Sequence, residues 1–316
     1  MAVTANQVKE LREATGVGMM DCKKALEETG GDMNAAIDWL RTRGLAKAAK
    51  KAGRVAAEGL VGVSLEGTKA SIVEVNSETD FVARNDQFQG IVGSVAKLAL
   101  DAKGSIEKLA EMPFPGTGRS VAAELTDAIA KIGENMNLRR SQVIEVKDGV
   151  IGSYVHNTVK PGMGKLGVIV GIESTGDKAV LAGLGKQLAM HIANTNPASV
   201  SEADIDPALV AKEREIYTEQ AKETGKPAEV IAKMVEGRVR KFFEESTLLA
   251  QTFVIDGESK VKDIVAKAEK EAGAPIKVTK FVRYALGEGI EKQETDFAAE
   301  VAATSGVPQK DKAAAQ

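Results

Sequence analysis

The hydrophobic residues near the start of the chain recur at helical intervals, in three short stretches separated by glycines. The first stretch begins with a Thr-x-x-Gln capping box at Thr4, and the second, MMDCKKALEETGG, ends in a glycine pair. Asp32 can cap the third stretch, MNAAIDWLRTRG, which we expect to end at Gly44. The pattern predicts a three-helix module over residues 1–46. Such a small module buries little apolar surface, so some is expected to remain available to a partner.

Alternating apolar and polar positions replace the helical period further along the chain. The runs GLVGVSLEG and KASIVEVN are joined through Gly67 and predict a β-hairpin, followed by a helix from near Asp86 and a longer helix over RSVAAELTDAIAKIGENMNLRRSQ. Strands in VIEVKDGVIGSYVHN and KLGVIVGIES, and a helix in KAVLAGLGKQLAMHIANTNP, repeat this order. The recurrence predicts an α+β fold with two related core subdomains, at residues 57–146 and 147–290.

Residues 207–245 return to helical periodicity without strand character. Gly225 and Pro227 stand where one helix ends and the next begins, which predicts an antiparallel helical hairpin (a coiled coil) inserted into the second subdomain. Two sets of positions mark its expected inner faces: Leu209, Glu213, Ile216 and Gln220, then Ile231, Met234, Arg238 and Phe242. The hairpin packs either on its own domain or against a second subunit, and is therefore a candidate for homodimerisation.

The remaining segments are connections and ends. Residues 47–56 are basic, rich in alanine and poor in large apolar residues, and we interpret them as a solvated, partly helical linker rather than a nucleic-acid-binding arm. A C-terminal helix is expected at residues 291–304, anchored by Phe297, and a disordered tail at residues 305–316.

Composition narrows the classes of function. The 42 basic and 45 acidic residues give a net charge of −3, which argues against a protein whose main task is to hold a phosphate backbone. Cys22 is the one cysteine, so an internal disulfide is excluded and a reducing compartment fits. No apolar run reaches membrane-spanning length, and the N-terminus resembles neither a signal nor a transit peptide. We therefore expect a cytoplasmic protein that does not bind membranes.

A search for catalytic chemistry finds no enzyme motif. His156 and His191 lack partners at metal-ligand spacing, and His191 lies among apolar residues, as a structural histidine does. The string GMGKLG at residues 162–167 matches G-x-G-x-x-G, but a strand follows where a dinucleotide site needs a helix. We expect neither an enzyme nor a cofactor, but a protein that acts through its surface.

Apolar residues in irregular places are candidates for that surface. Phe81, in the stretch NSETDFVARND, belongs to the core if one helix runs on from Thr79, but cap residues at Asn85 and Asp86 indicate a separate turn after the strand, where loops carry function. Both interpretations are open from the pattern alone. Met19 and Met20, beside a glycine turn, could likewise fill a core or contact a partner.

Several stretches of the chain resemble bacterial elongation factor Ts, the guanine-nucleotide exchange factor for elongation factor Tu. ETDFVARND resembles its TDFVA motif, and LREATGVGMMDCKKALEETGGD its N-terminal module. AKIGENMNLRR, GSYVH, GKPAEVIAKMVEGRVRKF and GEGIEKQETDFAAEV are similar to its core, helical hairpin and C-terminal module. The resemblance covers nearly the whole chain in the family order. The loop NTVKPGMGK departs from it, because it looks longer than in the best-known members.

The resemblance implies both a fold and a role. The implied fold has an N-terminal module like a ubiquitin-associated domain, two α+β core subdomains and a coiled-coil hairpin. The implied role is to bind elongation factor Tu with GDP, displace Mg²⁺ and promote GDP release during translation elongation, without direct contact to nucleic acid. The positions that match the Mg²⁺-dislocating motif are Thr79, Asp80, Phe81 and Val82. Secondary partner contacts are implied for Met19, Met20, Lys23, Ile132, Gly133 and His156.

Three other classes of function compete with this role. One is a scaffold or chaperone that uses the helical hairpin. The second is an RNA-associated protein that uses the basic residues 47–54, and the third is an enzyme built on the glycine-rich loop. Acceleration of GDP release from elongation factor Tu separates exchange from all three.

Overall fold

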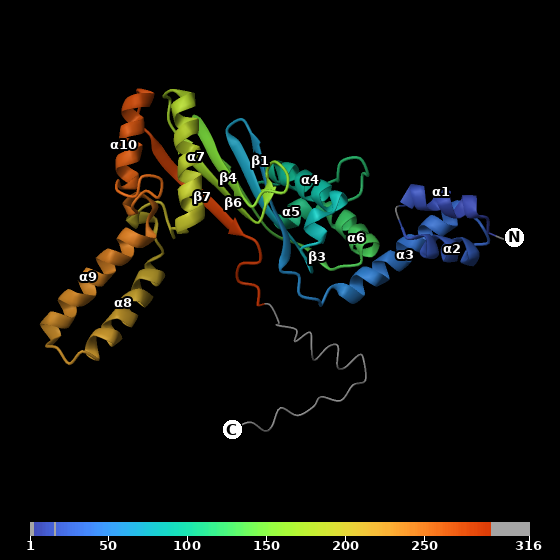
Figure 1. Ribbon diagram of the computed structural model, residues 1–316, viewed down its shortest axis with the longest axis horizontal. Helices are drawn as coiled ribbons and strands as arrows, with labels where there is room; N and C mark the ends of the chain where they lie inside the picture. Colours follow the sequence, from blue (N-terminus) through green and yellow to red (C-terminus); the bar gives the residue numbers. More distant parts are fainter. Residues whose placement is uncertain (1–2, 16, 292–316) are drawn as a thin grey trace, which may run out of the picture.

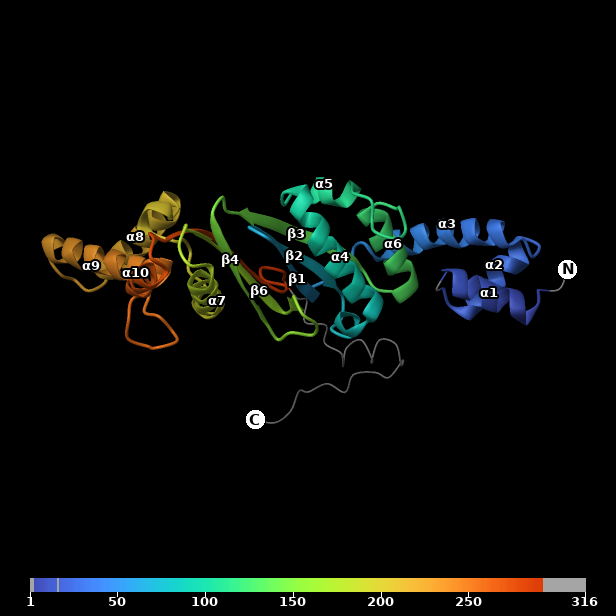
Figure 2. The same cartoon turned by 90° about the horizontal axis from the view of Figure 1, so that it is seen from above.

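Two antiparallel sheets lie face to face at the centre of the molecule, with helices on their outer sides (Figure 1, Figure 2). The computed structural model describes residues 3–15 and 17–291. Its strands are β1 (Glu58–Glu66), β2 (Lys69–Ser77), β3 (Met136–Glu145), β4 (Gly149–His156), β5 (Met163–Gly164), β6 (Leu166–Glu173) and β7 (Lys277–Ala285). One sheet has the order β3-β2-β1-β5 and the other β4-β6-β7. The α+β class predicted from the sequence is confirmed.

The helices flank these sheets and extend the molecule at both ends. They are α1 (Ala5–Thr15), α2 (Met19–Glu28), α3 (Met33–Lys51), α4 (Asp86–Ala102), α5 (Ile106–Glu111), α6 (Val121–Ile132), α7 (Lys178–Thr195), α8 (Pro207–Lys222), α9 (Ala228–Ser246) and α10 (Val261–Ala272). Both views place α1 to α3 at one end and α8 and α9 at the other (Figure 1, Figure 2). Among the described residues, no helix combines the length and apolar character needed to cross a bilayer.

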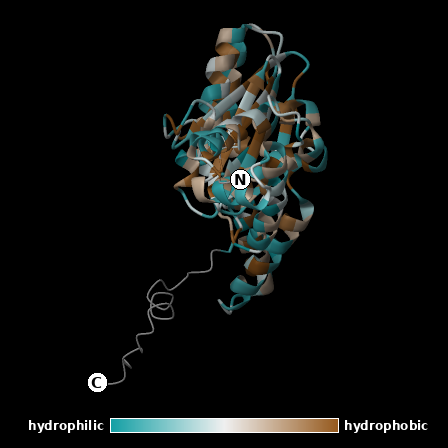
Figure 3. Ribbon diagram, turned by 90° about the vertical axis from the view of Figure 1, so that its right-hand side faces the viewer, coloured by the Kyte–Doolittle hydropathy of each residue, from teal (hydrophilic) through white to brown (hydrophobic). Residues whose placement is uncertain are grey.

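Strand periodicity decides which side chains each layer buries. Val61 of β1 and Ile169 of β6 lie in the core between the two sheets, whereas Leu60 faces the core under α4 and Val168 the core under α7. Neighbouring residues of one strand therefore serve different cores, because successive side chains point to opposite faces. Figure 3 shows hydrophobic residues concentrated along these central strands.

The two halves of the core have the same topology. In each half a hairpin (β1–β2 or β4–β6) is followed by a helix (α4 or α7), and a third strand (β3 or β7) pairs antiparallel with the second. Each second strand has a register shift, after Glu74 in one half and after Gly171 in the other. A glycine at positive φ lies opposite each shift, Gly59 in the first half and Gly149 in the second. A Cβ added to Gly59 would stand 2.2 Å from the Val75 oxygen, and one added to Gly149 would stand 1.8 Å from the Ile172 oxygen.

The N-terminal helices form where the pattern predicts them, with one correction. The capping box is confirmed by bonds from Thr4 N to Gln7 Oε1 (3.0 Å) and from Gln7 N to Thr4 Oγ1 (3.3 Å), and Asp32 caps α3. The prediction that α3 ends at Gly44 is wrong, because the helix continues to Lys51. Gly44 serves close packing instead: a Cβ there would lie 3.1 Å from the Ala130 Cβ of α6.

The expected solvated linker at residues 47–56 therefore begins inside this helix. Ala48 is buried in the core that α4 and α6 share with the first sheet. Alanine is the best helix former, so the alanine-rich run extends α3 rather than loosening it. The helical residues 47–51 agree with the partly helical character expected for this segment, and all of them except Ala48 are at least partly exposed.

Two other boundaries differ from the prediction. The long helix expected over RSVAAELTDAIAKIGENMNLRRSQ ends at Ile132, because Gly133 takes φ 90° and residues from Met136 onward pair with β2 as β3. In the hairpin, most of the inner face is shifted by one residue from the expected positions. Its core comprises Val210, Tyr217, Ala221, Ile231, Met234, Val235, Val239 and Phe243. The shift buries apolar side chains and leaves Gln220 and Arg238 exposed, where they bond to each other at 2.7 Å.

A fully buried carboxylate joins the first sheet to the turn after β7. Glu74 of β2 accepts hydrogen bonds from Asn76 Nδ2 and Gly287 N, each at 2.9 Å, and pairs with Arg139 (3.1 Å) and Arg140. Burial disfavours the charged form, but the bonds from Gly287, Asn76 and Arg140 outweigh it and lower the pKa of Glu74. The network fixes the point from which the chain leaves the core toward residue 291.

The buried His191 joins α7 to the base of the hairpin. Its Nδ1 accepts a bond from Val254 N at 3.2 Å, so Nε2 carries the proton and bonds to Gln251 Oε1 at 2.8 Å. Gln251 Nε2 in turn donates to the Glu245 oxygen of α9 at 2.6 Å. Burial lowers the pKa of His191 and keeps it neutral. The interpretation of His191 as a structural residue is confirmed.

Most of the expected C-terminal helix at residues 291–304, its anchor Phe297 and the expected tail lie outside the described residues.

Candidate functional site

Phe81 lies in the connection between β2 and α4, on a short, well-defined turn. Residues Val82–Arg84 form a 3₁₀ helix, and the N–H groups of Arg84 and Asn85 bond to the oxygens of Phe81 (3.1 Å) and Val82 (2.9 Å). Asn85 then caps α4 by accepting from two N–H groups of its first turn, at 2.9 and 3.1 Å. The predicted start of the helix is confirmed. Of the two cap residues expected there, Asn85 makes the cap, and the capping pair that the spacing of Asp86 and Gln89 also fits does not form. Gln89 Nε2 instead donates to the Ala83 oxygen at 2.8 Å.

Burial changes abruptly along this turn. Phe81 is 74% exposed, while the next two residues, Val82 and Ala83, are 4% and 5% exposed and belong to the core under α4. Phe88, seven residues on, is fully buried in the same core. The core interpretation of Phe81 is therefore wrong, and its ring faces solvent on a turn whose adjoining residues are anchored.

The loop after α6 is hydrogen-bonded to the turn that carries Phe81. Thr79 donates through both N–H and Oγ–H to the two carboxylate oxygens of Glu134, at 2.9 and 2.6 Å. In return, Glu78 Oε1 accepts from Asn135 N at 2.6 Å. Gly133, which ends α6, accepts through its oxygen from Lys51 Nζ. The turn is thus bonded to the two residues that directly follow Ile132 and Gly133.

Asp80 has a weaker attachment than its neighbours. Its carboxylate lies 3.8 Å from Arg84 Nη2, and the side chains of Asp80 and Arg84 are 46% and 75% exposed. An exposed ion pair of this kind contributes little, about 0–1 kcal/mol. Asp80 is therefore free to exchange Arg84 for a group on a partner.

The other predicted contact residues are dispersed. Met19 and Met20 open α2 in the N-terminal module and are 53% and 76% exposed, so they do not fill a core. Lys23, one turn further, pairs with Glu27 at 3.8 Å. His156 ends β4, is exposed, and its Nδ1 lies 2.9 Å from the Tyr154 hydroxyl. These residues form no single cluster with Phe81.

The loop after His156 reaches the helix that follows the Phe81 turn. Lys160 Nζ lies 2.7 Å from Asp86 Oδ1 and lowers the pKa of that carboxyl. Directly after this loop, the side chain of Met163 in β5 packs on Gly93 of α4. Sequence reasoning missed both contacts because Lys160 and Asp86 are 74 positions apart and carry no shared motif.

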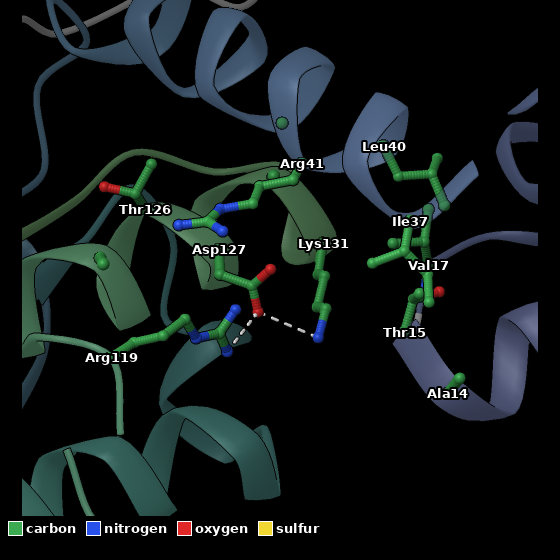
Figure 4. A pocket seen from close by; sticks show the side chains of 13 residues that line it. Ala14, Thr15, Val17, Ile37, Leu40, Arg41, Arg119, Thr126, Asp127 and Lys131 are labelled. Carbon is green, nitrogen blue, oxygen red and sulfur yellow. Dashed lines mark hydrogen bonds and ion pairs between the residues drawn. The ribbon is translucent and has the colours of Figure 1, made fainter. Parts of the chain in front are cut away.

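A cavity of about 250 Å³ separates the N-terminal module from α6 (Figure 4). Val17, Ile37 and Leu40 form its apolar side. On the opposite side Asp127 pairs with Arg119 at 3.3 Å and with Lys131 at 3.0 Å. In this region the module is attached to the core through the packing of α3 on α6.

The structure also bears on the competing hypotheses. In the basic stretch, Lys47 pairs with Asp21 (2.8 Å), Arg54 with Glu78 (3.4 Å), and Lys51 with a backbone oxygen. Three basic side chains of this stretch therefore already have partners within the chain. The glycine-rich loop lies against β1 and leads into strands, where a Cβ at position 162 would stand 2.8 Å from the Val63 oxygen. Within residues 3–15 and 17–291, no group of three or more His, Cys, Asp or Glu side chains is placed to hold a metal ion.

Comparison with known proteins identifies close relatives along almost the entire chain. The family model described as elongation factor TS matches residues 78–288, which include the Phe81 turn, Glu134 and His156. Elongation factor Ts of Parvibaculum lavamentivorans is 59% identical over 303 residues, covering 96% of this chain and 98% of the relative. The proteins of the same name from Rhizobium etli (60% over 301 residues, 95% and 98%) and Rhodospirillum centenum (58% over 304 residues, 96% and 99%) are equally similar.

Proposed function

The chain belongs to the elongation factor Ts family, and on this premise we propose that it is the guanine-nucleotide exchange factor for elongation factor Tu in translation elongation. It binds elongation factor Tu with GDP, displaces the partner's Mg²⁺ and promotes GDP release, so that GTP can rebind. It acts without a cofactor of its own and in the cytoplasm.

The observation that carries this proposal is the exposure of Phe81 on an anchored turn. A large apolar ring that is 74% exposed is unfavourable in water, and its neighbours Val82 and Ala83 are buried. Burial of this ring by a partner therefore stabilises the complex. A pocket between helices of the GTPase is the site that fits an aromatic ring presented in this way.

Insertion of the ring weakens GDP binding if the pocket opens only in a conformation that holds Mg²⁺ and phosphate poorly. GTPases hold the nucleotide through phosphate contacts and a Mg²⁺ ion that bridges protein and phosphates. Burying a phenylalanine stabilises the open conformation by about 1.5–3 kcal/mol. This shifts an equilibrium by roughly one to two decades. Asp80, beside the ring on the same turn, is the second residue proposed to contact the partner there.

The remaining contacts must also favour the open state, because binding both states equally shifts nothing. Met19, Met20 and Lys23 in the N-terminal module, Ile132 and Gly133 beside the turn, and His156 after β4 supply candidates for these contacts. Coupling is reciprocal, so GDP weakens binding of the factor as much as the factor weakens binding of GDP. Fresh nucleotide therefore displaces the factor, which can act again.

Release of fluorescent mant-GDP from purified elongation factor Tu tests the proposal directly. The rate of release should rise with the concentration of factor and then saturate. Absence of acceleration at micromolar factor would remove the exchange function and leave the scaffold hypothesis. Binding to RNA that weakens steeply as the salt concentration rises would indicate the RNA-associated alternative.

The hairpin formed by α8 and α9 is a second proposed interface, for a homodimer. It extends beyond the layered core, and Ile216 and Val230 on it are 38% and 40% exposed. The mass of the free protein from light scattering, compared with that of an Ile216→Glu variant, tests this proposal. A monomeric wild-type protein would exclude a dimer at that concentration.

A further inference from the structure

The turn that carries Phe81 is held by a carboxylate from a distant part of the chain. Glu134 uses one oxygen for Thr79 N–H (2.9 Å) and the other for Thr79 Oγ–H (2.6 Å). Hydrogen bonds to an ionised acceptor are stronger than neutral ones, and two from one residue also fix its orientation. Thr79 lies two residues before Phe81, so this contact fixes the backbone from which the ring projects.

A second set of bonds joins the same two segments in the opposite direction. Asn135, which is 2% exposed, donates its N–H to Glu78 Oε1 at 2.6 Å. Its Nδ2 donates to the Arg54 oxygen at 2.7 Å, and Arg54 Nη1 lies 3.4 Å from Glu78 Oε2. The end of α6, the turn and the segment after α3 thus form one connected network.

The network explains how an exposed ring can be held ready for a partner. Exposed loops move on timescales of about nanoseconds to microseconds, and ordering them on binding reduces the free energy available for the bound state. The buried residues Val82 and Ala83 anchor the turn on its C-terminal side. Glu134 restrains the N-terminal side through Thr79. The bond from Ser77 Oγ to the Thr79 oxygen, at 3.0 Å, and the Glu78 contacts described above act on the same side.

We propose that Glu134 is a positioning residue for nucleotide exchange: its contact with Thr79 preorganises Phe81 for insertion into the partner. This inference rests on the proposed exchange function and adds a residue to it. Glu134 acts through Thr79 and need not touch the partner, because both of its oxygens are already engaged within the chain. A direct contact would affect mainly the affinity for elongation factor Tu, whereas positioning affects mainly the rate of GDP release once the complex has formed.

Two substitutions separate these roles, Glu134→Ala and Glu134→Gln. The matched control is Glu111→Ala. Glu111 is an exposed glutamate at the end of α5 in the same subdomain. Stopped-flow release of mant-GDP over a range of factor concentrations gives the maximal rate and the half-saturating concentration. For Glu134→Ala we expect the maximal rate to fall about tenfold with little change in the half-saturating concentration. Glu134→Gln, which keeps one acceptor oxygen, should fall between this variant and the wild type, and Glu111→Ala should match the wild type.

Hydrogen exchange of the Thr79 amide provides an independent readout. In Glu134→Ala this amide loses its acceptor and should exchange faster, while amides inside α4 keep their protection and so report an intact core. Unchanged maximal rates in both Glu134 variants, or a loss seen only in the half-saturating concentration, would overturn the inference but leave the exchange function standing. Failure of the wild-type protein to accelerate release would overturn both. If Glu134→Ala does not fold, the Glu134→Gln result decides by the same criteria.

Discussion

Replacing Phe81 with alanine should separate nucleotide exchange from folding stability, and Phe88→Ala is the matched control. The two phenylalanines lie seven positions apart, one 74% exposed and the other fully buried in the core under α4. Removing an exposed side chain changes the free energy of unfolding by about 0.5 kcal/mol or less. Removing a buried phenylalanine costs about 3–5 kcal/mol.

The expected loss of exchange follows from the exposure of the ring. Full burial of a phenylalanine yields about 1.5–3 kcal/mol. Because 74% of Phe81 is still exposed in the free protein, roughly 1.1–2.2 kcal/mol of this remains for a partner to supply. At about 1.4 kcal/mol per factor of ten, Phe81→Ala should slow GDP release roughly 6- to 40-fold.

Two measurements test this reasoning on the same samples. Urea denaturation followed by circular dichroism reports stability, and mant-GDP release at saturating factor reports exchange. Phe81→Ala should keep the wild-type urea midpoint and lose exchange, whereas Phe88→Ala should lower the midpoint. A strongly lowered midpoint for Phe81→Ala would refute the assignment of its ring to the surface, and an unchanged release rate would refute its role in exchange.

Three further substitutions test the buried and strained parts of the fold. Glu74→Gln should destabilise the protein by about 1–3 kcal/mol, because it removes the charge that two partly buried arginines share at the buried Glu74 carboxylate. Since the pKa of Glu74 is lowered by folding, its stabilisation is present above a pH of about 4.3 and should be lost on further acidification, which urea midpoints against pH would detect. Burial lowers the pKa of His191, so the free energy of unfolding should fall as the pH drops below about 6.5, where the buried imidazole has to be charged. His191→Gln should flatten this pH dependence. An equally steep profile for the variant would contradict the assignment to His191. Gly149→Ala should cost about 1–3 kcal/mol or more, because the new Cβ would lie 1.8 Å from the Ile172 oxygen. The control Gly183→Ala, inside α7 with nothing within 4 Å, should instead stabilise by about 0.5–1 kcal/mol, and equal unfolding temperatures for the two variants would contradict the steric argument.

Local rules predicted the Phe81 turn because its boundaries are set by residues close in the chain. An asparagine followed by a helical pattern marks the start of α4 whatever the rest of the fold does, and this separates Phe81 from Phe88. The identity of the cap was less predictable, since the Asp86–Gln89 spacing fits a capping pair as well as Asn85 does. Gln89 Nε2 donates instead to the Ala83 oxygen, a contact that forms only when the turn has folded.

Contacts between distant segments decided the features that sequence reasoning missed. Gly44 looks like a helix end, but close packing on Ala130 keeps it inside α3. The restraint of Thr79 by Glu134 joins residues 55 positions apart, and no local period or motif indicates it. In the hairpin, a shift of one residue is within the ambiguity of a helical pattern, and the packing of Val235 and Val239 against Ala221 resolved it.

The two halves of the core differ in the connection between the second strand and the helix that follows it. Both halves lead from a second strand to a helix capped by Asn or Asp, with Asn85 before α4 and Asp177 before α7. The second half makes this connection in four residues, 174–177, and the first half uses eight, 78–85. Closing the shared topology therefore does not require the longer connection. A longer exposed loop is also harder to keep ordered, yet this one is fixed at both sides and presents Phe81 to solvent. The extra length and the restraint by Glu134 have a common explanation if this connection is the part of the core that acts on the partner.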